Sequence, residues 1–265
     1  GPERSLYFWH YNTSKKSLTM DLNADAGLDL FRRLVAGADV VLDSHHPGHL
    51  DDLGIGYEEL RSIRPDLVMA AVSPFGKEGP YANYAMTDLT ALAFGGPAWS
   101  CGYDDHDVPP VRGGGNQGYH TASHFAAIGI LIALVHRQQT GVGQFLDVNM
   151  HAALNVTTEA GSYTYLVTQE NVKRQTGRHA SVRQMPPSQI LGPGGRYLNV
   201  GFPARTEEQW IQLLAWLEDE GVVGDLQDYL SPPSRQALQA GDEAALEQLR
   251  KVSGAITSMA QDKDP

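Results

Sequence analysis

Several features that often define a class of protein are scarce in this sequence. Cysteine occurs once among 265 residues, at Cys101, so no disulfide can form within the chain. Positive charge is also scarce, because 20 lysines and arginines face 31 aspartates and glutamates and leave a net charge of −11. A chain this acidic has no basic surface with which to hold the phosphates of a nucleic acid, so we expect no nucleic-acid partner. The single cysteine favours a reducing, cytoplasmic location.

Long hydrophobic runs are missing as well. The longest, residues 125–135, is too short to span a bilayer, so we expect no membrane partner. No apolar leader of the kind that directs secretion precedes the first motifs. The chain starts without methionine and enters an apolar stretch at residues 5–9 almost at once. We therefore expect the central segment of a longer protein, lacking both ends.

The sequence does contain an alternation of strand and helix patterns. Residues 17–22, 39–42 and 67–72 have the patterns of strands, and residues 27–35 and 57–63 between them have the apolar spacing of helices. This order is typical of a parallel sheet with covering helices. We therefore predict a Rossmann-like α/β fold.

Helices and short strands dominate the rest of the chain. Residues 119–138 form the strongest predicted helix, which is apolar on most faces and therefore expected to be buried. Another helix is expected over residues 149–169, and residues 172–187 are basic and irregular. A hairpin of residues 188–191 with 196–202 then precedes helices at residues 206–221 and 234–260.

This change of pattern predicts two domains. The central part of a large domain would occupy residues 1–180, and a linker with a smaller α+β domain would occupy residues 181–265. In open α/β sheets, ligands bind beyond the carboxyl ends of the strands. Two loops qualify by position, residues 44–48 and 73–81, but neither has the glycine spacing of a nucleotide-phosphate loop.

Short motifs follow one another in a fixed order along most of the chain. Taken together, over residues 5–202, they resemble the family III coenzyme A (CoA) transferases, the group that includes formyl-CoA transferase and the carnitine CoA transferases. The motifs are N-T-S-K-K-S (12–17), D-L (21–22), A-D-V-V-L (38–42), P-G (47–48), L-G (53–54), Y-E-E-L (57–60), S-P-F-G-K-E-G-P-Y-A (73–82), T-D-L (87–89), P-P-V-R (109–112), A-A-I-G-I-L-I-A-L (126–134), T-G-V-G-Q-F-L-D-V (140–148) and Q-T-G-R (175–178).

The resemblance implies a fold, an assembly and a reaction. Family members form an interlocked dimer, and each chain has a Rossmann-like large domain and a smaller domain. They move CoA from an acyl-CoA donor to a carboxylic acid, with CoA thioesters as substrates and no metal. An aspartate carboxylate attacks the thioester, passes through a mixed anhydride and then holds CoA as an aspartyl thioester, which keeps the acyl group activated.

The sequence departs from this pattern at the nucleophile. Counting back from the motif at residues 126–134 places the aspartate position at Tyr119, and residues 113–124 contain no Asp or Glu. A phenol stays protonated near neutral pH, and an aryl ester is a poor substitute for the anhydride route. His120 is a candidate general base. Asp88 keeps the position of an acidic or polar residue near the catalytic centre, or else caps the helix that follows. His120 and His124 lie one helical turn apart, but no third ligand is evident, so no metal site is expected.

Further departures concern the CoA site. Ser44 and His45 replace the Asn-Phe pair of the family, and Asp52 stands where a basic residue is common, which would repel phosphate. Lys15 either contacts CoA or belongs to a solvated surface pair with Lys16. The residues expected to approach CoA are Lys15, Ser44, His45, Ser73, Phe75 and Arg112.

Three functions follow from these observations. The chain is a CoA-transferase subunit, in a homodimer or in a heteromer with a homologous chain that supplies the aspartate. Alternatively it is a catalytically silent acyl-CoA-binding or scaffold protein with the transferase fold. The third interpretation is an enzyme with a relocated nucleophile at Asp104, Asp105 or Asp107, although that polar stretch is also typical of a solvated loop tip.

Overall fold

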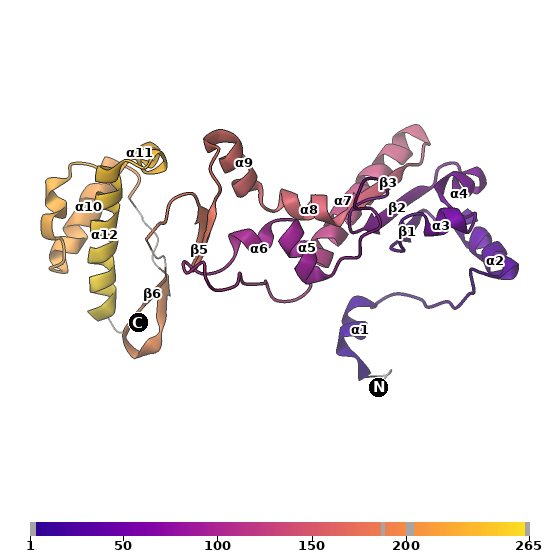
Figure 1. The fold of residues 1–265 in the computed structure, drawn as a ribbon, viewed down its shortest axis with the longest axis horizontal. Helices are drawn as coiled ribbons and strands as arrows, with labels where there is room; N and C mark the ends of the chain where they lie inside the picture. Colours follow the sequence, from indigo (N-terminus) through magenta and orange to yellow (C-terminus); the bar gives the residue numbers. More distant parts are fainter. Residues whose placement is uncertain (1–3, 187–188, 200–203, 263–265) are drawn as a thin grey trace. The chain divides into compact units, whose positions relative to one another are not determined.

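The structure, a computed structural model, describes residues 4–186, 189–199 and 204–262 (Figure 1). The chain forms two compact units. Unit 1 comprises Gly1–Ala85 and Ala122–Met150, and unit 2 comprises Met86–Thr121 and His151–Pro265. The predicted division into residues 1–180 and 181–265 does not coincide with these units and stays a prediction.

Unit 1 is built on a parallel sheet, as the sequence predicts. Its strands are β1 (Val40–Asp43), β2 (Val68–Ser73) and β3 (Phe145–Asn149), in the order β1-β2-β3. Val40 pairs with Val68 and Met69 pairs with Phe145, so all three strands run the same way. The predicted strand at residues 17–22 is wrong, because this stretch has no regular secondary structure and no paired strand in the described part of the chain, and most of its residues are exposed.

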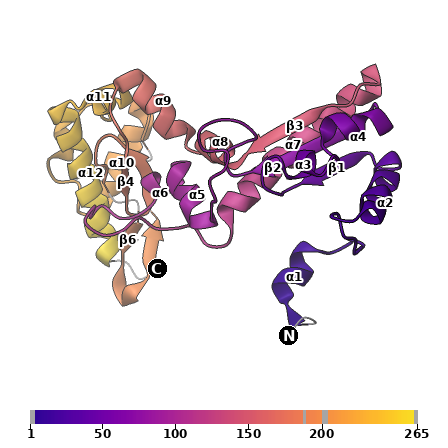
Figure 2. The same cartoon turned by 45° about the vertical axis from the view of Figure 1, so that its right-hand side comes forward.

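Helices cover both faces of this sheet (Figures 1 and 2). Side chains alternate between faces along a strand, and Met69 joins one apolar core with Val35, Leu50 and Leu60. These three residues come from α2 (Asp25–Ala36), α3 (His49–Asp52) and α4 (Tyr57–Ile63). On the other face, Gly129 of α7 (Gln117–Thr140) lies against Leu146 of β3. The predicted α/β class with covering helices is therefore confirmed, whereas the interlocked dimer stays a prediction.

Helix α7 differs from its prediction in burial. Ala126 and Ala133 on one side of the helix are buried. Ile128, Leu131 and Ile132 on the opposite side are 55%, 63% and 65% exposed. The described elements cover only the side of α7 that faces the sheet. By length and composition alone α7 could cross a membrane, a property that core helices of soluble proteins share. The expectation of no membrane partner stays a prediction.

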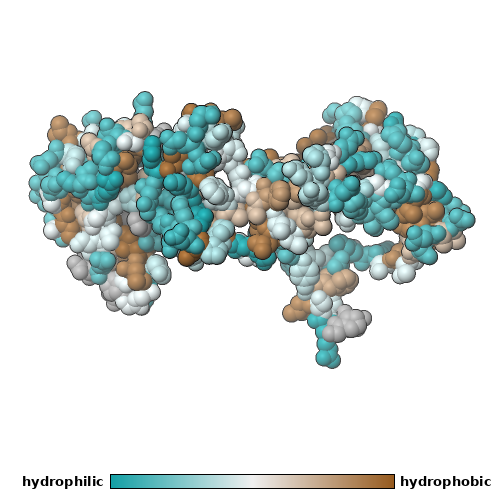
Figure 3. Space-filling view, in the orientation of Figure 1, coloured by the Kyte–Doolittle hydropathy of each residue, from teal (hydrophilic) through white to brown (hydrophobic). Residues whose placement is uncertain are grey.

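A short aromatic helix precedes the sheet in the sequence of unit 1. Helix α1 (Leu6–Tyr11) begins after Ser5, whose hydroxyl accepts the N–H of Phe8 at 3.1 Å. Tyr7, Phe8 and Trp9 are all at least half exposed. Apolar side chains therefore reach the surface in this part of the chain, and others do so on the face drawn in Figure 3.

Unit 2 begins with α5 (Asp88–Phe94) and α6 (Pro97–Ser100) and resumes after β3 with α8 (Met150–Val156) and α9 (Glu159–Thr168). The single helix predicted over residues 149–169 is therefore wrong. Turns at Thr157 and Thr158 separate two helices, and the hydroxyl groups of both threonines donate to carbonyls three residues back. The stretch predicted as irregular contains an antiparallel pair, β4 (Lys173–Gln175) and β5 (Arg178–Ser181), which turns at Gly177 with φ 64°.

The C-terminal part of unit 2 has its own apolar core around Trp210, which is fully buried. The predicted hairpin is observed as β6 (Gln189–Leu191) and β7 (Tyr197–Asn199), joined through a 3-10 turn at Pro193–Gly195. Ser188 and residues 200–202 of that prediction lie outside the described residues. The remaining elements are α10 (Glu207–Asp219), a 3-10 helix at Gly224–Asp228, α11 (Arg235–Ala240) and α12 (Glu243–Asp262).

Candidate functional site

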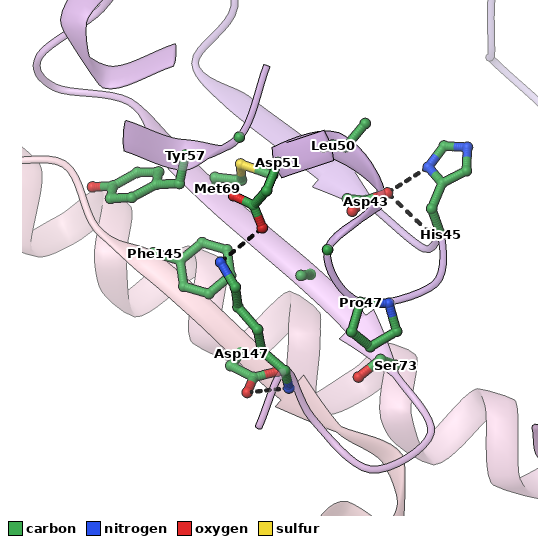
Figure 4. A pocket seen from close by; sticks show the side chains of 14 residues that line it. Asp43, His45, Pro47, Leu50, Asp51, Tyr57, Met69, Ser73, Phe145 and Asp147 are labelled. Atoms are coloured by element: carbon green, nitrogen blue, oxygen red, sulfur yellow. Dashed lines mark hydrogen bonds and ion pairs between the residues drawn. The ribbon is translucent and has the colours of Figure 1, made fainter. Parts of the chain in front are cut away.

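The residues predicted for the site fall into two groups, one in each unit. The first group surrounds a pocket at the carboxyl ends of the strands in unit 1 (Figure 4), called the sheet-end pocket below. An open hollow of about 480 Å³ adjoins it and shares several of its residues. The sheet-end pocket is lined by Asp43, His45, Pro47, Gly48, Leu50, Asp51, Gly56, Tyr57, Met69, Ala71, Ser73, Lys77, Phe145 and Asp147.

The strand ends themselves position two predicted residues in this pocket. Asp43, the last residue of β1, accepts both the backbone N–H and the ring Nδ1 of His45, at 2.9 and 2.6 Å. Ser73, the last residue of β2, accepts the N–H of Gly76 at 3.0 Å. Gly76 has a φ of +86°, so the loop after β2 turns at a residue without a side chain.

Three other predicted CoA contacts lie elsewhere. Phe75 is buried and lines the adjoining hollow. Ser44 lies in the loop after β1 but is not among the lining residues. Lys15 donates to the side chain of Asn12 at 3.2 Å and lines neither hollow among the described residues. Asp52, expected to repel phosphate, is also outside the lining, and its neighbour Asp51 lies there instead.

Lys77 is a pocket residue that the sequence reasoning missed. Its ammonium is 2.9 Å from Oδ2 of Asp51 and 5.5 Å from the ring centre of Phe145. Its backbone N–H donates to Oδ2 of Asp147 at 2.8 Å. Asp147 belongs to β3, seventy residues along the chain, so no local pattern joins it to Lys77. The only sequence signal was the position of Lys77 in the loop after a predicted strand.

The second group gathers at the first turn of α7, in unit 2. Asp88 is the first residue of α5, and its side chain is 6% exposed. Its Oδ1 accepts the backbone N–H of Gly118 at 2.7 Å, whereas its Oδ2 has no hydrogen-bond partner among the described residues. The guanidinium of Arg112 lies 3.8 Å from that oxygen. Thr87, not Asp88, is the N-cap of α5, since its hydroxyl accepts the N–H of Thr90.

Tyr119 follows Gly118, whose backbone N–H donates to Asp88. Its side chain is 46% exposed at the start of α7, and His120 beside it is half-buried. Glycine suits position 118 because a larger residue would crowd Asp88: a Cβ there would lie 3.1 Å from Oδ1 of Asp88. The structure thus brings Asp88, Arg112 and the first turn of α7 together. The roles assigned to these residues stay predictions.

The polar loop proposed for a relocated nucleophile is anchored rather than free. Asp104 is ion-paired with Arg178 of β5, and its backbone N–H donates to the hydroxyl of Thr176 at 3.0 Å. Arg174 of β4 donates to the carbonyls of His106 and Val108 in the same loop. Asp104 therefore has a structural partner. The interpretation of this stretch as a solvated loop tip fails at Asp104, whose side chain is only 30% exposed.

Comparison with known proteins gives a consistent family. A family model described as CoA-transferase family III matches residues 1–259. Succinyl-CoA:(R)-benzylsuccinate CoA-transferase subunit BbsE of Thauera aromatica is 36% identical over 222 residues, which are 84% of this chain and 52% of that protein. The alpha subunit of succinyl-CoA–L-malate CoA-transferase of Chloroflexus aurantiacus is 38% identical over 141 residues, covering 53% of this chain and 33% of that protein.

The fold has solved counterparts. The crystal structure of a CaiB/BaiF family protein from Brucella suis matches with a TM-score of 0.65 and 26% sequence identity, covering 95% of this chain and 65% of that one. The chain spans about half the length of the Thauera relative and a third of the Chloroflexus relative.

Proposed function

We propose, because the chain belongs to CoA-transferase family III, that it works as one subunit of an acyl-CoA:carboxylate CoA transferase. In this proposal a homologous chain supplies the nucleophilic aspartate, and the present chain provides the non-nucleophilic site of a heteromer. The observation that carries the proposal is the exposed side chain of Tyr119 at the predicted nucleophile position, on a helix turn held by the buried carboxylate of Asp88.

The chemistry explains why Tyr119 is incompatible with a nucleophilic role. A carboxylate attacks the thioester carbonyl and expels the CoA thiolate, which leaves a mixed anhydride. The thiolate then attacks the aspartyl carbonyl, releases the donor acid and forms the aspartyl thioester. The acceptor acid repeats these steps in reverse and leaves with CoA. A phenol has no carbonyl carbon to carry CoA, so Tyr119 cannot form the second intermediate.

Three features support the heteromer over a homodimer with two silent sites. Both relatives named above are subunits by their own descriptions. The contact between Asp88 and Gly118 orders the first turn of α7 without an acid at position 119. The exposed apolar side of α7 offers surface for a partner chain. A cytoplasmic location belongs to the same proposal, since CoA thioesters are intracellular metabolites and Cys101 is a free thiol.

Trapping a covalent intermediate tests the proposal. The full-length protein would be incubated with acyl-CoA donors, alone and after co-expression with a homologous chain that has Asp at this position, and both chains analysed by mass spectrometry. We expect a CoA adduct on the homologous chain and none on this one. In the variant Tyr119→Asp we expect an adduct on this chain, and the matched variant Tyr119→Asn should give none.

Two results would contradict the proposal. An adduct on the wild-type chain would show that it has its own nucleophile. If the complex binds CoA thioesters but neither chain forms an adduct under any condition, the alternative function as a silent acyl-CoA-binding or scaffold protein is favoured.

A further inference from the structure

We propose that Lys77 is the residue of the sheet-end pocket that recognises a phosphate group of CoA, and that Asp51 holds its ammonium while the pocket is empty. The identity of the ligand rests on the proposed function. The assignment of Lys77 rests on the geometry of the pocket.

The contacts of Lys77 separate a fixed backbone from a movable side chain. Its backbone N–H is bound to Asp147 at 2.8 Å, so the residue stays at the mouth of the pocket. Its side chain is 43% exposed, and that of Asp51 is 44% exposed. An ion pair in this much contact with water is weak, so the ammonium can exchange partners. The ring of Phe145 lies under the ammonium, with its centre 5.5 Å away, and adds a weak cation–π contact.

The charges of the lining residues single out Lys77 as the group that can attract a phosphate. Of the described residues that line the sheet-end pocket, Lys77 is the only lysine or arginine, and the same holds for the adjoining hollow. The carboxylates in these linings belong to Asp43, Asp51, Glu58, Glu78 and Asp147. A phosphate entering this acidic region needs the one ammonium in its lining, because the carboxylates repel it.

A phosphate can displace Asp51 from Lys77. It brings more negative charge than a carboxylate and more acceptor oxygens, so its charge-assisted hydrogen bonds to an ammonium are stronger. Removing the carboxylate of Asp51 should therefore have two effects in the same direction. It frees Lys77, and it removes one repelling charge from the pocket.

The chain contains a matched control for this arrangement. In unit 2, Lys251 is paired with Asp225, and its ammonium lies 5.6 Å from the ring centre of Tyr229. A lysine, an aspartate and an aromatic ring therefore recur together, with tyrosine in place of phenylalanine. Lys251 and Asp225 line neither the sheet-end pocket nor its adjoining hollow. Substitutions there reproduce the loss of an exposed ion pair without touching the proposed phosphate site.

Calorimetry on the full-length chain at low ionic strength tests the proposal, with CoA, 3′-dephospho-CoA and adenosine 3′,5′-bisphosphate as ligands. We expect Lys77→Gln to weaken binding of the bisphosphate roughly fivefold and Asp51→Asn to tighten it roughly threefold, magnitudes typical of exposed charge contacts. Lys251→Gln and Asp225→Asn should bind as the wild type does. Circular dichroism would show that all four variants are folded.

Two other results would contradict the proposed role of Lys77. If CoA binds equally to wild type, Lys77→Gln and Asp51→Asn, Lys77 is not the phosphate contact, and the proposed function is unaffected. If the bisphosphate binds to no variant, including Asp51→Asn with its released lysine, the phosphate site is overturned. The adduct experiment would still decide the proposed function separately.

Discussion

The sheet-end pocket of unit 1 and the first turn of α7 in unit 2 hold their polar groups in different ways. In the pocket, Lys77 and Asp51 meet through side chains that are each more than 40% exposed. At the turn, the 6% exposed carboxylate of Asp88 binds a backbone N–H of Gly118. Contacts between exposed side chains can rearrange when a ligand arrives. A contact between a buried carboxylate and the backbone persists whatever side chain stands at position 119.

The largest effect should come from Gly143→Ala, which should displace β3, one of the strands that carry the sheet-end pocket. A Cβ at position 143 would lie 2.1 Å from the carbonyl oxygen of Leu67, so β3 must move away from β2. Backbone displacement of this kind destabilises by about 3 kcal/mol. Urea unfolding followed by circular dichroism would measure the loss.

The control for this substitution is Gly254→Ala, in a helix where nothing lies within 4 Å of the added carbon. It should change the free energy of unfolding by less than about 1 kcal/mol, in the stabilising direction. Equal effects of the two substitutions would show that the close approach at Gly143 does not matter.

Asp88→Ala should have the next largest effect on the free energy of unfolding, because it acts at the first turn of α7. The substitution leaves the N–H of Gly118 buried without its acceptor, and such a group typically destabilises by roughly 2 kcal/mol. Asp88→Asn keeps an oxygen that can accept the same bond, so it should be markedly milder. The free energies of unfolding from urea titrations compare the two. An Asn variant as unstable as the Ala variant would mean that the charge, not the hydrogen bond, holds the turn.

Gly118→Ala tests the same Asp88–Gly118 contact and should lower the free energy of unfolding by less than Asp88→Ala does. The added Cβ would lie 3.1 Å from Oδ1 of Asp88 and 3.2 Å from Cβ of Ala91. We expect a loss of about 1 kcal/mol, because crowding exceeds the gain in helix propensity. Combining it with Asp88→Ala should give less than the sum, since both changes act on one contact. Strict additivity in a double-mutant cycle would contradict this.

The smallest effect concerns an ion cluster at the opposite end of the sheet. A hydrogen bond from Arg64, followed by the charges of Arg64 and Arg137, holds the pKa of Asp66 below its usual range. A carboxyl group whose pKa is lower in the folded chain stabilises it above the unfolded pKa. That stability is lost as pH falls through the folded value. Asp66→Asn should therefore flatten the decline of stability below about pH 4.

Urea midpoints measured from about pH 5 downward would check this prediction. The difference between wild type and Asp66→Asn should shrink in high salt, since the group is exposed. Asp29→Asn, which removes an exposed helix ion pair, is the matched control. The same pH slope in wild type and Asp66→Asn would show that the cluster does not contribute.

The sequence predicted the sheet well because its strands are apolar and short. β1 and β2 were found from continuous apolar runs, whereas the cap of α5 was expected at Asp88 and lies one residue earlier, at Thr87. Residues 17–22 misled because alternation predicts a strand only where a neighbour exists to pair with it. The exposed side of α7 could not be predicted, since an apolar pattern shows what a helix is able to bury, not what lies beside it.

The candidate site shows the same limit. His45 and Ser73 were found because they lie in loops that follow predicted strands, and Asp88 because of a motif. Lys77 and Gly118 were missed because their partners, Asp147 and Asp88, lie 70 and 30 residues away. Contacts of that range follow from the fold and leave no local pattern.

The turn that precedes Tyr119 has a genetic consequence. The codons of tyrosine and aspartate differ only in their first base, so a single point mutation would place a carboxylate at position 119. Because Asp88 binds the backbone of the preceding residue, that mutation needs no second change to keep the turn in order. A growth selection that depends on CoA transfer, applied to cells in which this is the only family member, would therefore recover revertants at one codon.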